Sequence, residues 1–166
     1  MPRGVYFEDM EIGETRETLG RTITETDIIN FAGVSGDFNP LHINAPYAEA
    51  SQFGDRIAHG VLGLAVATGQ AYSLGFLEGT IIAFLECAWK FRGPIYIGDT
   101  IRTISKITKK REMPSAGGGL ITFDVKLLNQ KDETVQKGTW TVMVASRPGE
   151  DAPQQTPASR VDSDHD

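Results

Sequence analysis

The run of small and apolar residues at positions 60–77, GVLGLAVATGQAYSLGFL, constrains the fold more than any other part of the sequence. On a helix it is apolar nearly all round, and a helix of this kind is buried on every side. Its four glycines weaken it as an isolated helix but let a sheet or a second helix approach closely. We therefore expect one long helix at the centre of the fold.

Four segments after this helix are typical of strands. Each is rich in β-branched and aromatic residues, and turn residues such as Gly, Pro, Asn and Asp separate them. These segments are 80–91, 100–108, 119–129 and 134–146, and residues 14–23 are a candidate fifth strand. Strands that follow one another so closely predict an antiparallel sheet, so the expected fold class is α+β.

Shorter helices are expected before the central one. The sequence TETD at 24–27 has the spacing of a helix start, and the apolar residues after it end near glycines 33 and 36. Residues 44–50 are a second candidate. Between them lies SGDFNPLH, residues 35–42, in which Gly36 and Pro40 oppose helix. We expect the chain to leave the first helix at Gly36 and to run extended to His42.

Asp37 and His42 are the candidate acid–base residues of this string. Histidine titrates nearest to neutral pH, and a carboxylate beside it can share in proton transfer. Spacing alone leaves a structural alternative, in which Asp37 caps a turn and His42 is a hydrogen-bonded core residue. A metal site formed by Asp37, His42 and His59 is a further alternative, but the spacing lacks a typical metal-binding pattern, and we expect no metal.

His59 and Gly60 stand directly before the central helix. The first N–H groups of a helix lack partners within it and lie at its positive end, where they can polarise a bound carbonyl oxygen. Gly60 has no side chain to keep a ligand away. The alternative is an ordinary helix start with a glycine at its first position.

Taken together, these segments closely resemble the MaoC-like, (R)-specific enoyl-CoA hydratase family. The resemblance covers about residues 5–146 and includes the small residue Ala48 and the His59–Gly60 pair. The residues that match the family's central string are Gly36, Asp37, Asn39, Pro40, Leu41 and His42. The resemblance implies a hot-dog fold, in which an antiparallel sheet of about five strands wraps around one long helix.

The same resemblance implies an activity and roles for residues. The expected reaction is the reversible syn addition of water to trans-2-enoyl-CoA, giving (R)-3-hydroxyacyl-CoA, with coenzyme A as part of the substrate and no separate cofactor. Asp37 and His42 would activate the water, and the Gly60 N–H would hold the thioester carbonyl. Asn39 and His59 would support the site. Thr68 stands where some members have a serine, so its role stays open.

Three other functions remain open. The same fold carries acyl-CoA thioesterases, as well as dehydratases that act on branched or acidic acyl-CoA or on acyl-carrier-protein substrates. A non-enzymatic binding module is the third. Because the chain holds a single repeat of the fold, which leaves a sheet edge exposed, we expect a homodimer or a higher homo-oligomer.

Bulk properties exclude several classes of protein. The net charge is −6, with two arginines against five acids in residues 147–166, so a general nucleic-acid binder is not expected. No uninterrupted apolar run approaches the roughly 18 residues of a membrane span, and we expect no secretory signal, no membrane association and a cytoplasmic location. We expect residues 1–146 to form one domain, residues 147–166 to be a disordered acidic tail, and Cys87 to lie in the core.

Two sets of residues are candidates by composition alone. Aromatic side chains that can line an acyl tunnel are Tyr72, Phe76 and Phe84. Cations that can bind the phosphates of coenzyme A are Lys90, Arg92, Lys109, Lys110 and Arg111.

Overall fold

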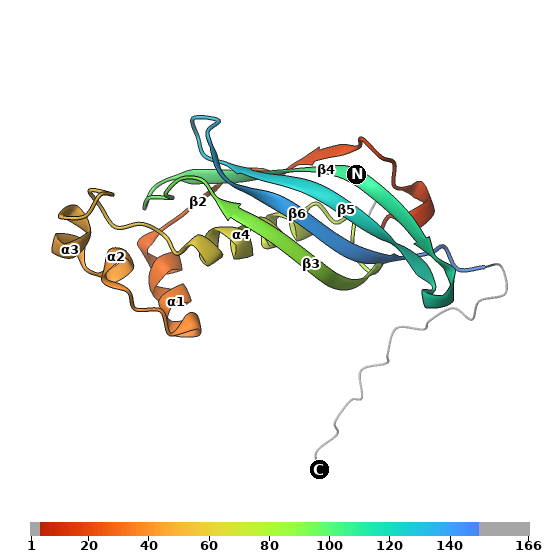
Figure 1. Ribbon diagram of the computed structural model, residues 1–166, viewed down its shortest axis with the longest axis horizontal. Coiled ribbons are helices and arrows are strands. Elements are labelled where there is room, and N and C mark those ends of the chain that lie inside the picture. The colour runs from red at the N-terminus through yellow and green to blue at the C-terminus, as the bar shows by residue number, and fades with distance from the viewer. Residues whose placement is uncertain (1–3, 150–166) are drawn as a thin grey trace, which may run out of the picture.

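The predicted central helix, α4 (Gly60–Ser73), lies inside the curve of a six-stranded antiparallel sheet in the computed structural model, which describes residues 4–149 (Figure 1). The sheet order is β1-β4-β5-β6-β3, and β2 also pairs with β4. The strands are β1 (Thr15–Glu17), β2 (Arg21–Thr22), β3 (Ile81–Phe91), β4 (Thr100–Met113), β5 (Gly118–Leu128) and β6 (Thr134–Ala145). This arrangement confirms the α+β class and the helix-in-sheet architecture.

Two strand predictions needed revision. The segment 14–23 forms two short strands, β1 and β2, which both pair with β4. Strand β4 continues beyond its predicted end, because its last residues, up to Met113, pair with the start of β5 at Gly118. The 3-10 helix η2 (Pro114–Ala116) closes that hairpin, and η1 (Phe7–Asp9) packs beside β5.

The core lies between the inner face of the sheet and α4. Along β5, buried Phe123, Val125 and Leu127 alternate with exposed Asp124 and Lys126, as expected for a strand with one buried face. From α4 the buried residues are Leu62, Gly63, Val66, Ala67, Gln70 and Ala71. The one polar side chain among them is satisfied, since Gln70 Nε2 donates to Ile101 O at 2.8 Å and its Oε1 accepts from Thr103 Oγ1 at 2.8 Å.

The prediction that α4 is buried on every side was wrong for the single chain. Val61 and Tyr72, on its outer side, are 55% and 68% exposed. Strand β3 is an edge strand that is exposed along most of its length, and Cys87 on it is exposed rather than part of the core. Two adjacent apolar elements that nothing in residues 4–149 covers are typical of a contact surface.

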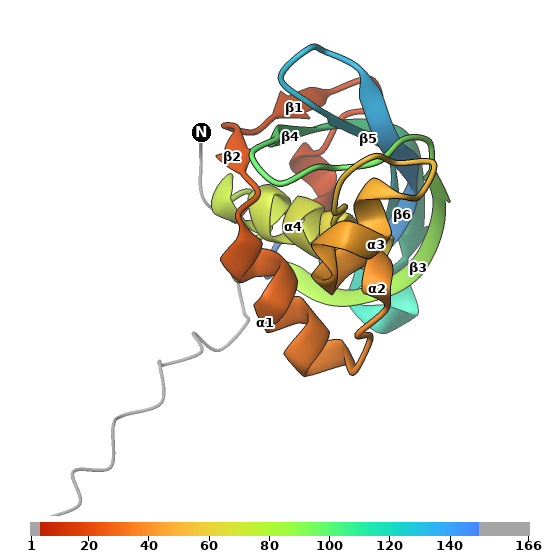
Figure 2. The ribbon, with the colours of Figure 1, turned by 90° about the vertical axis from the view of Figure 1, so that its left-hand side faces the viewer.

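Helices α1–α3 lie over one end of the sheet and α4 (Figure 2). Helix α1 (Glu25–Ser35) begins at the predicted cap, where Thr24 Oγ1 accepts from Asp27 N and Asp27 Oδ2 accepts from Thr24 N. It ends at Gly36, whose positive φ of 75° favours glycine. Helices α2 (Pro40–Ile43) and α3 (Ala45–Glu49) follow.

The extended path predicted from Gly36 to His42 was only partly correct. Pro40 keeps Asn39 out of the helical region, with φ −56° and ψ 133°, as expected for a residue before proline. Proline is nevertheless well suited to the first position of a helix, and Asn39 Oδ1 caps α2 by accepting from Leu41 N at 3.0 Å. His42 therefore lies on a short helix.

We expected residues 147–166 to form a disordered tail. Most of this tail, residues 150–166, lies outside the described residues. Within residues 4–149 no helix is long and apolar enough to cross a bilayer.

Candidate active site

Three side chains from separate elements meet at the start of α4. Asp37 comes from the loop after α1, His42 from α2, and His59 is the residue that precedes Gly60 at the helix start. One ligand atom from each, a carboxylate oxygen or a ring nitrogen, lies within 4.8 Å of the other two. Asp37 is exposed, whereas His42 and His59 are buried. The structure thus brings together three of the residues that the sequence singled out.

Backbone hydrogen bonds fix the tautomer of each imidazole. His42 Nδ1–H donates to Ile57 O at 2.7 Å, so its Nε2 keeps a free lone pair. His59 Nε2–H donates to Asp37 O at 2.8 Å, and its Nδ1, a buried atom, has no partner among the described residues. The two rings are in contact, with centroids 3.8 Å apart and planes tilted by 31°. His59 therefore holds the Asp37 loop against α4 and supports the ring of His42.

The Asp37 carboxylate is held by its own loop. One of its oxygens, Oδ1, accepts from Asn39 N at 3.1 Å, and Asp37 N donates to Ser35 Oγ at 3.2 Å. No lysine, arginine or histidine within residues 4–149 forms an ion pair with this carboxylate. Asn39 thus braces the loop through its backbone and α2 through its side chain, and the second Asp37 oxygen is left for a ligand.

The geometry is suited to proton transfer, because each imidazole donates from one ring nitrogen to a backbone carbonyl and keeps its other nitrogen for a ligand or a proton. The same arrangement occurs in histidines that bind metals, so the metal site considered from the sequence stays an alternative for these three residues.

The start of α4 offers free donors beside His42. Leu62 N and Gly63 N both donate to His59 O, whereas the N–H groups of Gly60 and Val61 have no partner among the described residues. Both residues line a cavity of about 520 Å³ together with His42. A Cβ on Gly60 would lie 2.8 Å from the Phe91 ring, so any other residue would have to displace that ring. The positive end of the helix therefore faces the space next to the imidazole.

Gln136 on β6 is a site residue that the sequence analysis missed. Its Nε2 donates to Gly60 O at 3.0 Å, its Oε1 accepts from Trp89 Nε1 at 2.9 Å, and it lines the same cavity. The Gln136 amide thus holds the first peptide of α4 in place, and Gly63, which has no side chain, leaves room for that amide. The sequence did hold a signal for this residue, namely a glutamine at a position of the predicted strand 134–146 that faces the core.

Thr68 lies away from this site in the same chain. It is eight residues after Gly60 on α4, a separation of about 12 Å along a helix. Its hydroxyl donates to Ala65 O at 2.7 Å. It lines a second, apolar cavity of about 150 Å³, together with the three aromatic residues that composition had suggested, Tyr72, Phe76 and Phe84.

Sequence comparisons show which proteins the chain resembles. A family model described as MaoC like domain matches residues 8–121. The (R)-specific enoyl-CoA hydratase of Rhodospirillum rubrum is 38% identical over 103 residues, which cover 62% of this chain and 69% of that protein. The 3-hydroxybutyryl-CoA dehydratase of Methylorubrum extorquens is 35% identical over 99 residues, which cover 60% of this chain and 61% of that protein.

Solved structures show the same fold. A monoamine oxidase regulatory protein from Archaeoglobus matches with a TM-score of 0.82 and 34% identity, over 89% of this chain and 98% of that one. A Mycobacterium tuberculosis protein described as a double hot-dog fold matches with a TM-score of 0.78 and 21% identity, over 94% of this chain and 52% of that one, which bears on the fold alone. The fold is a hot dog, and the chain belongs to the MaoC-like domain family.

Proposed function

We propose that this protein is a hydro-lyase that adds water reversibly, in syn fashion, to trans-2-enoyl-CoA and gives (R)-3-hydroxyacyl-CoA. The observation that carries the proposal is the approach of Asp37 and His42 within 4.8 Å, next to the free N–H groups of a helix start. The names of the two relatives, an enoyl-CoA hydratase and a hydroxyacyl-CoA dehydratase, support the same reaction class in its two directions.

The site accounts for each bond that changes. A water held between the Asp37 carboxylate and His42 Nε2 loses a proton to one of them while its oxygen attacks C3 of the enoyl group. The same group then delivers that proton to C2 from the same side, which makes the addition syn and restores the starting state of the site, while the other group holds the water in place. The Gly60 N–H, with that of Val61 beside it, accepts the negative charge that develops on the thioester oxygen. The reaction needs no cofactor apart from the coenzyme A of the substrate.

A hydration assay tests this function directly. With crotonyl-CoA we expect the enoyl absorbance to fall without release of free thiol, because water attacks C3 and the thioester survives. A thiol reagent in the same cuvette is the control. Release of thiol without loss of the enoyl group would instead identify a thioesterase, which is the main alternative on this fold.

We propose that the protein acts as a homodimer joined through β3. The free edge of this strand and the outer face of α4 form one apolar surface, since Ile81, Phe84 and Tyr72 line a single cavity. A twofold dimer buries the same patch of both subunits. Light scattering at micromolar concentration is expected to give about twice the chain mass, and a monomer there would contradict the proposal.

Such a dimer completes the acyl site. In a twofold antiparallel pair of β3 strands, the Phe91 end of one strand lies beside the Ile81 end of the other. The cavity next to His42 is at the Phe91 end and the apolar cavity is at the Ile81 end, so each acid–base pair faces the apolar cavity of the partner. A cavity of about 150 Å³ holds a group the size of benzene, which indicates acyl tails of about six carbons or fewer.

Mixing two inactive variants tests this shared site. His42→Ala removes the acid–base pair, and Thr68→Phe fills the apolar cavity from an exposed position on α4. If the acyl cavity comes from the partner, a heterodimer has one intact site, and co-refolding equal amounts is expected to restore about a quarter of the wild-type activity with hexanoyl-length enoyl-CoA. Light scattering and tag exchange must first show that the mixture contains heterodimers. If such a mixture recovers no activity, the whole site lies in one chain.

A further inference from the structure

Three lysines stand directly opposite one another across neighbouring strands. Lys90 on β3 pairs in register with Lys137 on β6, and Lys137 pairs in register with Lys126 on β5. Residues paired in this way share a face of the sheet, and neighbouring strands are about 4.8 Å apart. The three form one lysine row on the outer face, because their chain neighbours Phe91, Gln136 and Leu127 point inward.

This arrangement is unfavourable for the protein alone. Like charges directly opposite each other in a sheet are destabilising. None of the three lysines has an ion pair within residues 4–149, and Asp124, two residues before Lys126 on the same face, is directly opposite Lys106. No ion pair among the described residues therefore offsets the repulsion, and the row is suited to binding an external anion.

The lysine row lies behind the wall of the candidate active site. Phe91 and Gln136, the chain neighbours of Lys90 and Lys137, both line the cavity next to His42. Arg92 lines that cavity too and is exposed, with its backbone held by a hydrogen bond from its N to Val135 O at 2.8 Å. Arg92 thus stands where the chain leaves β3, between the cavity and the outer face.

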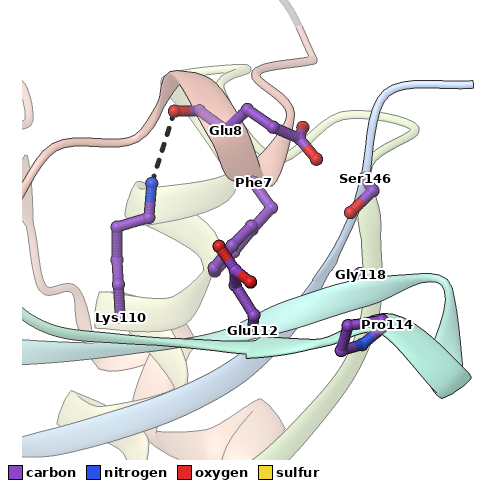
Figure 3. A pocket seen from close by; sticks show the side chains of 7 residues that line it. All are labelled: Phe7, Glu8, Lys110, Glu112, Pro114, Gly118 and Ser146. Atoms are coloured by element: carbon purple, nitrogen blue, oxygen red, sulfur yellow. Dashed lines mark hydrogen bonds between the residues drawn. The ribbon is translucent and has the colours of Figure 1, made fainter.

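The other candidate cations lie elsewhere. Lys109 and Arg111 pair with Thr122 and Leu120 near the β4–β5 hairpin, at the end of the sheet away from α1–α3 (Figure 1). Lys110 is near the same end, in a cavity that also presents the carboxylates of Glu8 and Glu112 (Figure 3). Its Nζ already donates to the carbonyls of Glu8 and Met10 and lies 4.5 Å from the centre of the Phe7 ring.

We infer that Arg92, Lys90, Lys137 and Lys126 bind the phosphates of the coenzyme A nucleotide, an inference that rests on the proposed function. The phosphates are separated from the thioester by the whole pantetheine arm, so they must lie outside the cavity that holds the reacting carbons. Coenzyme A carries a diphosphate and a separate 3′-phosphate, and a row of cations along the outer face provides several contacts for them.

Substrates with and without phosphates test this site. The double variant Lys90→Gln/Lys137→Gln is expected to lower kcat/KM for crotonyl-CoA about tenfold, mainly through KM, because two charge contacts are lost. Turnover of crotonyl-pantetheine, which has the same reacting group and no phosphate, is expected to change less than about twofold. Added salt is expected to weaken only the first reaction.

Matched controls separate this effect from a general change in charge. Lys109→Gln/Arg111→Gln removes two positive charges at the opposite end of the sheet and is expected to leave both substrates unaffected. An equal loss on both thioesters in the Lys90→Gln/Lys137→Gln variant, or no loss on crotonyl-CoA, would overturn the inference. The inference would also be overturned if the variant lost as much activity with crotonyl-phosphopantetheine as with crotonyl-CoA. The site would then bind the single phosphate of phosphopantetheine, which acyl carrier proteins also carry.

A binding experiment keeps the inference separate from the reaction. Adenosine 3′,5′-bisphosphate, titrated calorimetrically, is expected to bind the wild-type protein and the control variant about tenfold more tightly than the Lys90→Gln/Lys137→Gln variant. Equal binding to all three proteins would refute the phosphate site even if enoyl-CoA is hydrated. Weaker binding to that variant would support the site even if the hydration assay fails.

Discussion

Asp37→Asn and His42→Ala are each expected to lower kcat/KM for hydration of crotonyl-CoA by at least about 100-fold, the usual contribution of a general acid or base. Asparagine keeps an oxygen that can accept from Asn39 N, so the loop is expected to persist while the charge is lost. In His42→Ala the imidazole that holds or activates the water is gone. Initial rates from enoyl absorbance, with thermal unfolding measured in parallel, check both.

The control for this experiment is an exposed carboxylate nearby. Glu49→Gln, on α3, makes the same chemical change as Asp37→Asn outside the cluster of Asp37, His42 and His59, and full activity is expected. His59→Phe keeps a ring under His42 but loses the hydrogen bond to the Asp37 loop, so an intermediate loss is expected. Wild-type rates in either Asp37→Asn or His42→Ala would rule out the assigned roles.

Gly63→Ala is expected to lower the free energy of unfolding by about 2 kcal/mol, because a buried hydrogen-bonding group loses its partners. The added Cβ would lie 2.5 Å from Gln136 Nε2 and must push away an amide that is 98% buried. That amide holds both Gly60 O and Trp89 Nε1, so the first peptide of α4 is expected to shift and hydration to slow as well. Chemical denaturation and initial rates measure the two effects.

Gly69→Ala on the same helix is the matched control. Its Cβ would have no atom within 4 Å, and alanine favours helix by about 0.8–1 kcal/mol over glycine, so a more stable and equally active protein is expected. Equal stability of the Gly63→Ala and Gly69→Ala variants would show that Gln136 does not constrain the helix.

Local signals in the sequence predicted much of the fold. The capping pattern at Thr24, the end of α1 at Gly36 and the start of α4 at Gly60 all depend on residues close in sequence, and the structure has them where they were expected. The strands were recognised for the same reason. The SGDFNPLH string identified Asp37 and His42 as candidates because it combines helix-breaking residues with an acid and a base.

Features that depend on pairing between distant residues were not predicted. Apolarity marked α4 as buried and placed Cys87 in the core, but it does not distinguish a core from a contact surface, and Cys87 is exposed. Gln136 reaches Gly60 across 76 positions of the sequence. The lysine row exists only through the register of three strands, and composition does not show that Lys109 and Arg111 lie at the other end of the sheet.

The most direct test of the central claim is the stereochemical course of hydration in D₂O. We expect crotonyl-CoA to give (R)-3-hydroxybutyryl-CoA with one deuterium at C2, on the face to which oxygen was added, as observed by NMR and chiral chromatography. This result follows if Asp37 and His42 handle one water molecule from a single side. An (S) product, deuterium on the opposite face, or free thiol without a hydroxyacyl product would contradict the account.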